Sequence, residues 1–194
     1  MEEIVENTKI VNSQLGSKKE EKAFVLDYLP YGYPLENKRF PIIQAIGIKN
    51  LTLLQLVPRK GETIEVKEEL YIGEGKRDKV QFIQGRLLRE KLTESAKDLL
   101  EEFLEKIVEE REEEYVDFFN KAQAINTRLH QFELLPGFGK KHTNAILDAK
   151  DEKEFESFED IKSRVHNLPD PKMAISKRIF EELTEMQRNN LFIK

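Results

Sequence analysis

The stretch Leu134-Leu135-Pro136-Gly137-Phe138-Gly139-Lys140-Lys141 interrupts a helical pattern with two glycines and then lets it restart. Apolar residues recur at helical spacing on both sides, at Ile125, Leu129 and Phe132 before the glycines and at Ala145, Ile146 and Ala149 after them. This spacing predicts a helix over residues 125–132, a tight turn, and a second helix that begins after Gly139.

The residue types in this turn favour a phosphate ligand. Two glycines let the backbone approach a ligand closely, and consecutive N–H groups that lead into a helix N-terminus form an anion site. Lys140 and Lys141 add positive charge, and residues 121–150 hold five basic and two acidic side chains. We expect Phe138 to point inward and hold the turn in place.

The turn resembles the helix-hairpin-helix motif, a sequence-independent clamp on nucleic-acid backbones. The resemblance implies a nucleic-acid site at Pro136, Gly137, Phe138, Gly139, Lys140 and Lys141. The structural alternative is an ordinary glycine C-cap followed by a new helix.

A second helical pair follows about 30 residues later. Ser157 with Asp160 is typical of a capping box, and Asp170 before Pro171 is typical of a helix start. The loop between the two helices, at residues 166–171, lacks glycine and contains an acid. We therefore expect residues 121–194 to form a tandem helix-hairpin-helix domain whose second copy packs against the first.

The N-terminal half carries a β signal. Alternating apolar residues and turn residues predict about five short strands, over 24–28, 42–46, 51–57, 70–72 and 80–88. Such a series favours a small OB-like β-barrel over residues 21–90, preceded by a flexible arm over residues 1–20.

Between these parts, residues 91–120 predict a long amphipathic helix with eleven acidic and four basic side chains. Its Glu run is typical of a solvated face. The functional alternative is a protein-interaction adaptor, in which this acidic linking helix docks a basic protein partner.

Composition excludes several classes of protein. The 194-residue chain has 36% charged residues, a net charge of −5 and zero cysteines, which excludes disulfides, thiolate metal sites and cysteine nucleophiles. It contains neither a long apolar run nor an apolar signal-peptide stretch. We expect a cytoplasmic protein with no membrane association.

Three further groups of residues have weaker signals. Lys76, Arg77 and Lys79 form either a second basic patch for nucleic acid or an exposed polar turn. Tyrosines 28, 31 and 33 favour a rigid bend over a base-stacking face. His130, His142 and His166 lack metal-ligand spacing, so we expect no metal and no cofactor.

An enzyme is the least favoured alternative. Some DNA glycosylases follow a helix-hairpin-helix with an Asp about 20 residues later, and Asp160 lies 21 residues after Gly139. The segment after Gly139 is too short for their base-accepting pocket. No P-loop or hydrolase elbow is visible.

The order of motifs resembles an archaeal family, domain-of-unknown-function family 655. The resemblance runs from about Ala23 to Leu183 and is carried by residues 24–34, 71–73, 118–120, 128–131 and the glycine turn. It implies a β-barrel ahead of a helix-hairpin-helix region and RNA as a ligand. The sequence therefore predicts an α+β protein that binds nucleic acid, RNA favoured over DNA, without catalytic residues.

Overall fold

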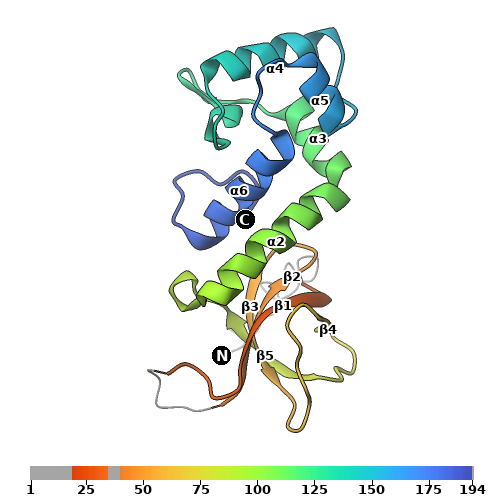
Figure 1. The fold of residues 1–194 in the computed structure, drawn as a ribbon, viewed down its shortest axis with the longest axis vertical. Helices are drawn as coiled ribbons and strands as arrows, with labels where there is room; N and C mark the ends of the chain where they lie inside the picture. Colours follow the sequence, from red (N-terminus) through yellow and green to blue (C-terminus); the bar gives the residue numbers. More distant parts are fainter. Residues whose placement is uncertain (1–18, 35–39, 194) are drawn as a thin grey trace, which may run out of the picture. The chain divides into compact units, whose positions relative to one another are not determined.

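The computed structural model describes residues 19–34 and 40–193, which form a mixed α+β protein (Figure 1). These residues divide into two compact units, one that ends at Lys97 and one that begins at Asp98. The arm predicted over residues 1–20 lies outside the described residues as far as residue 18. Glu20 departs from that prediction, because it is buried and its carboxylate accepts hydrogen bonds from the Lys49 and Asn50 N–H groups.

The first unit is a curled five-stranded antiparallel sheet, a half-barrel with strand order β4-β1-β2-β3-β5. Its described pairings leave β4 and β5 as the two edges. The five predicted strands are thus confirmed, and a sheet with two edges takes the place of a closed barrel. The strands are β1 (Lys22–Leu29), β2 (Ile42–Gly47), β3 (Leu53–Pro58), β4 (Glu69–Tyr71) and β5 (Val80–Arg86).

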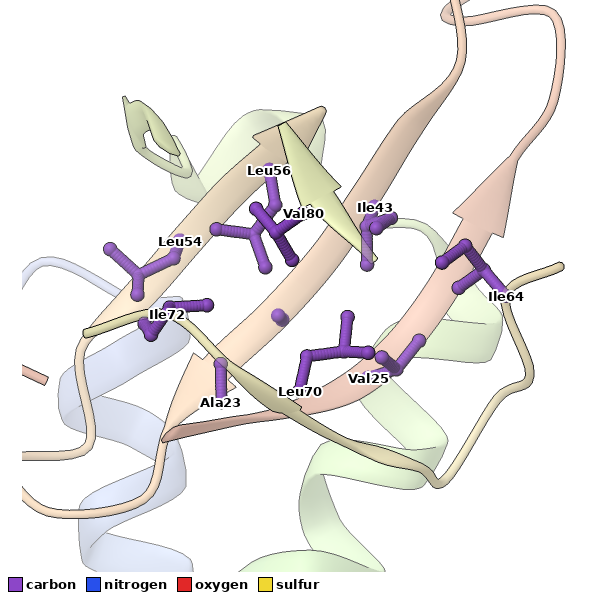
Figure 2. Close-up of a cluster of buried hydrophobic side chains, with 10 residues drawn as sticks. Ala23, Val25, Ile43, Leu54, Leu56, Ile64, Leu70, Ile72 and Val80 are labelled. Atoms are coloured by element: carbon purple, nitrogen blue, oxygen red, sulfur yellow. The ribbon is translucent and has the colours of Figure 1, made fainter. Parts of the chain in front are cut away.

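One face of this sheet holds the apolar core of the first unit. Figure 2 shows side chains from all five strands and from the segment around Ile64 converging on one cluster. Alternation along each strand sends every second residue to this face, which explains why Val25, Ile43 and Leu56 are fully buried. This burial defines the register of the sheet.

The opposite face carries a polar network at its centre. Gln44 and Gln55 are paired across β2 and β3, and the Tyr33 hydroxyl donates to Gln55 Oε1 at 3.0 Å. Gln44 Nε2 donates to the Lys91 carbonyl and Gln44 Oε1 accepts from the Thr93 N–H. Both amides are buried, so these bonds satisfy groups that would otherwise be costly to desolvate.

The predicted long helix forms in two pieces, α2 (Glu94–Glu110) and α3 (Glu112–Lys121), preceded by the 3₁₀ turn η1 (Arg89–Lys91). Thr93 caps α2, because its Oγ1 accepts from the Ala96 N–H at 3.1 Å. The helix breaks at Arg111, where φ is −111° and ψ is 34°. Glu112 after the break is not a solvated acid, since its carboxylate accepts from the Phe158 N–H.

The helix predicted over residues 125–132 is wrong. The structure has a two-stranded hairpin there, β6 (Ala124–Asn126) and β7 (Leu129–His130), followed by the 3₁₀ turn η2 (Gln131–Leu134). The physical reason is local: Asn126 Oδ1 accepts from the Arg128 N–H at 2.9 Å, an Asx turn that competes with helix formation. β-Branched Ile125 and Thr127 also disfavour a helix.

The remaining helices are α4 (Lys140–Glu152), α5 (Phe158–Arg164) and α6 (Pro171–Thr184). Both predicted starts are confirmed, because Ser157 Oγ accepts from the Asp160 N–H and Asp170 Oδ1 accepts from the Met173 N–H. Arg164 caps the end of α4 by donating to the Ala149 and Lys153 carbonyls.

After α6 the chain folds back onto the helix around Glu182, whose side chain is fully buried. Its carboxylate accepts from the consecutive N–H groups of Leu191, Phe192 and Ile193, at 2.6, 3.0 and 2.9 Å, and from Arg178 Nε at 2.9 Å. We call this arrangement the carboxylate clasp. It places the Phe192 ring against Phe118, with 5.0 Å between ring centroids.

Candidate nucleic-acid interface

The glycine turn identified in the sequence connects η2 to α4. The backbone conformation at its first glycine, Gly137, favours glycine over any other residue. Gly137 has φ +83°, a region that side chains other than glycine adopt at a cost. A Cβ atom at Gly137 would lie 3.3 Å from Pro169 Cγ, so the α5–α6 loop packs directly against this turn. The contact between the two loops is therefore at Gly137.

The second glycine has no such constraint. Gly139 is extended, with φ −135° and ψ −177°, which any residue can adopt. Among the described residues other than its two neighbours in the chain, no atom lies within 4 Å of the position its Cβ would occupy. Neither conformation nor internal packing requires glycine here, and the open space is where an external group could approach the backbone.

Gly139 is also the N-cap of α4, and its lack of a side chain leaves the helix start bare. Within the described chain, α4 has no side-chain cap and no acidic residue in its first turn. The Lys140 and Lys141 side chains are exposed beside it. A helix start with free N–H groups, a partial positive charge and two flanking cations is suited to an anion.

Phe138 lies between the glycines and points inward, as predicted. It is buried, and its ring lies 6.3 Å from the Phe119 ring of α3. Phe119 in turn stacks on Phe132 of η2 at 5.5 Å. This aromatic packing fixes the turn against α3, so the N–H groups of the turn are held in place before any ligand binds.

The α5–α6 loop differs because its helix start is already filled by an anion of the chain. Asp170 caps α6 and also accepts a hydrogen bond from Lys162 Nζ at 2.8 Å. Burial opposes ionisation of Asp170, but the bonds from Lys162 and from the Met173 N–H outweigh it and hold the pKa of this carboxyl below its usual value. Of the two loops, the one at Gly139 has the helix start open to a ligand.

The basic patch predicted at Lys76, Arg77 and Lys79 lies in the first unit, on the segment between β4 and β5. Lys76 is exposed, whereas Lys79 pairs with Glu68 at 2.6 Å. The bond to Glu68 raises the pKa of Lys79, and Glu65 and Glu62 add to the shift. Lys79 is therefore balanced by nearby acids and is the weakest of the three as a phosphate contact.

Most of the other residues considered in the sequence analysis take part in packing, hydrogen bonds or ion pairs within the protein. Tyr28 packs on the apolar cluster, Tyr33 joins the polar network, and Tyr31 is 79% exposed beside Gly32, whose φ of +69° marks a bend. His130 is buried, and its Nδ1 accepts from the Phe132 N–H. Asp160 pairs with Arg164 at 3.1 Å.

Two findings concern metals and membranes. In the part of the chain that the structure describes, no three His, Asp or Glu residues are grouped as metal ligands would be. Over the same residues, no helix combines the length and the apolar character needed to cross a membrane.

Sequence reasoning missed one residue of the turn, His142. Its Nδ1 accepts a hydrogen bond from the Gly139 N–H at 3.2 Å, so this N–H is already engaged and a ligand would meet the N–H groups of the residues that follow Gly139. The sequence spacing could have predicted this bond. His142 stands three residues after the N-cap, and a side chain at that position can reach back to the N-cap N–H.

Residues 19–194 match the family described as Protein of unknown function (DUF655). The chain is 40% identical over 179 residues to the uncharacterized protein MJ0038 of Methanocaldococcus jannaschii, a match that covers 91% of this chain and 81% of that protein. It is also similar to the crystal structure of Af1531 from Archaeoglobus fulgidus. That match has 43% identity and a TM-score of 0.79, and covers 90% of this chain and 100% of the other.

Proposed function

The chain belongs to this archaeal family of proteins of unknown function, and we propose that it is a non-catalytic nucleic-acid-binding protein that grips the phosphate backbone at the turn before α4. RNA is favoured over DNA as the ligand. In this proposal η2, the turn and α4 act as a helix-hairpin-helix whose first helix is reduced to a 3₁₀ turn, and the α5–α6 pair is its packing partner.

The observation that carries the proposal is the bare start of α4 at Gly139. A glycine that is extended and faces open space has no role in the internal packing, yet it leaves room for a phosphate against the backbone N–H groups of the first turn. In the second unit, α5 and α6 have caps from Ser157 and Asp170. Lys140 and Lys141 supply the charge that phosphate contacts require.

The test replaces the open N-cap with the cap that α6 already has. We expect Gly139→Asp to maintain or raise thermal stability, because Asp is a better N-cap than Gly. Its carboxylate would occupy the N–H groups meant for phosphate, so binding to labelled RNA should weaken by at least about tenfold, the loss of one charge-assisted contact. Fluorescence anisotropy with RNA and DNA of the same sequence measures both ligands.

Asn144→Asp is the matched control, since it adds the same charge to an exposed position of the same helix one turn later. It should weaken binding much less than Gly139→Asp. The proposal fails if both variants bind RNA and DNA as tightly as the parent protein, or if they weaken binding equally.

A further inference from the structure

Two arginines at the start of β5 are held in place by backbone carbonyls. Arg59 directly follows β3, and its Nε donates to the Arg77 carbonyl at 2.8 Å. Arg77 Nε donates to the Gly73 carbonyl at 2.9 Å. Throughout the described residues, no hydrogen bond or ion pair engages the Nη groups of these two side chains.

The segment that carries Arg77 is a built turn. The Tyr71 hydroxyl accepts from the Gly75 N–H at 3.2 Å, and a Cβ atom at Gly73 would lie 2.5 Å from that hydroxyl. A side chain at Gly73 would therefore displace the Tyr71 ring from this position. Because each Nε is fixed to a carbonyl, the two guanidinium groups present their Nη groups with little rotamer entropy left to lose, and such groups match the oxygens of a phosphate.

Next to these arginines, β5 presents an aromatic ring to solvent. Phe82 is 46% exposed although it lies in the middle of the strand. Its partner across the sheet is Val57, two residues before Arg59, and the Arg59 N–H continues the pairing by donating to the Lys79 carbonyl at 2.8 Å. Arg59 therefore lies about 7 Å beyond the Val57–Phe82 pair along the direction of β3.

Charge along this edge also favours a polyanion. Residues 76–86 contain four basic side chains and one acidic one, 4 − 1 = +3, in a chain whose net charge is −5. Arg86 is exposed at the far end of β5. Lys79 contributes least, because Glu68 balances it.

We propose that the edge formed by Arg59, Arg77 and Phe82 is a second nucleic-acid site, specific for single strands: the arginines hold a phosphate and an unpaired base stacks on the Phe82 ring. The inference deepens the proposed function and rests on its premise that the protein binds nucleic acid. Base-paired nucleic acid keeps its bases stacked inside the duplex, so the aromatic contact is available only to a single strand. The site would thus make the protein prefer unpaired RNA.

The test uses the full chain and three probes: a labelled single-stranded oligouridylate, a duplex of the same length, and an abasic oligonucleotide of the same length. Phe82→Ala should weaken binding of the oligouridylate by roughly tenfold, the usual loss for one stacked base, with little change for the duplex or the abasic probe. Phe82→Tyr should retain the parent affinity. Arg59→Ala and Arg77→Ala should weaken binding of the abasic probe as well, since the two arginines contact phosphate and not the base.

Leu88→Ala is the matched control, because Leu88 is an exposed apolar residue just after the same strand. The inference is overturned if Phe82→Ala binds oligouridylate as tightly as the parent, or if it weakens all three probes equally. Gly139→Asp is measured in parallel. An effect of Gly139→Asp alone sustains the proposed function and rejects the second site. An effect of Phe82→Ala alone rejects the phosphate turn and keeps the β5 site, and a parent protein that binds none of the probes rejects both.

Discussion

At the scale of single residues, the two glycines of the turn have different roles that the sequence does not separate. The sequence analysis gives both glycines the same role, which is to let the backbone approach a ligand closely. The structure assigns Gly137 to the fold, through its positive φ and its contact with Pro169. Gly139 is conformationally ordinary and faces open space, so its role as a ligand contact stays a prediction.

This difference predicts that Gly137→Ala destabilises the protein. A residue with a Cβ at φ +83° costs about 1–2 kcal/mol, and the 3.3 Å contact with Pro169 adds to this. Gly61→Ala is the control, since Gly61 has φ +89° with open space around it in the described structure. Urea unfolding should show a larger loss of stability at Gly137 than at Gly61, and equal losses would mean that the loop contact is unimportant.

His130 predicts a pH dependence of stability. Burial lowers the pKa of His130 below its ordinary value of about 6.5, while Glu133 opposes the shift. The unfolded chain therefore takes up this proton first as the pH falls, so the stabilisation is complete above about pH 6.5 and is lost as the pH decreases through the folded-state pKa. His130→Asn keeps an acceptor for the Phe132 N–H and should flatten the decline in stability below about pH 6.5.

Chemical denaturation across this pH range measures the effect. His166→Asn serves as the reference because His166 is exposed. If the parent and His130→Asn lose stability in parallel, the imidazole is not the titrating group.

At the scale of secondary-structure elements, the sequence predicts correctly those elements that depend on contacts between residues close together in the chain. The five strands and the starts of α5 and α6 were predictable, because alternation and capping depend on nearby residues. The hairpin at β6 and β7 was missed because Ile125, Leu129 and Phe132 also fit a helical stripe. Their spacing does not reveal that Asn126 closes a turn between them.

The carboxylate clasp was equally invisible, since nothing local distinguishes Glu182 from its neighbour Glu181. We predict that Glu182→Gln destabilises the second unit by about 3–5 kcal/mol, because it removes the fully buried partner of the buried Arg178. Glu181→Gln should cost about 1 kcal/mol or less, since Glu181 is partly exposed and lies 3.5 Å from Arg178. Thermal melting compares the two variants. Similar melting temperatures would contradict the stabilising role of the carboxylate clasp.

At the scale of the whole molecule, the net charge of −5 hides a division of charge. Residues 91–120 carry four basic and eleven acidic side chains, and residues 121–150 carry five and two. Average charge alone would argue against a nucleic-acid ligand, whereas the local balance does not. For this reason the overall composition is weaker evidence for a nucleic-acid ligand than the glycine turn is.

Counterion release makes the proposed binding depend on salt. The logarithm of the RNA affinity should fall linearly with the logarithm of salt concentration, and Lys140→Ala combined with Lys141→Ala should reduce the slope by about 1 to 2. The measurement is a salt titration by fluorescence anisotropy. A parent slope near zero would favour the protein-interaction adaptor over a nucleic-acid binder.

The candidate sites also show that contacts between residues far apart in the chain cannot be predicted from the sequence. The turn and its lysines form a contiguous motif, so they can be chosen as candidates from the sequence alone. Arg59 and Phe82 are 23 residues apart, and only the pairing of β3 with β5 brings them together. Lys79 was proposed as a contact because sequence does not show that Glu68 lies beside it.

The carboxylate clasp also has a consequence for the time at which the second unit can be completed during synthesis. Phe118 is translated 74 residues before its ring partner Phe192. At about 5–20 residues per second, the aromatic cluster waits roughly 4 to 15 seconds for that partner on the ribosome. The half-barrel, in contrast, has all its strands once Arg86 is made. The nascent chain therefore carries a finished sheet while α3 still exposes apolar rings, and this is the interval in which a chaperone would find a binding site.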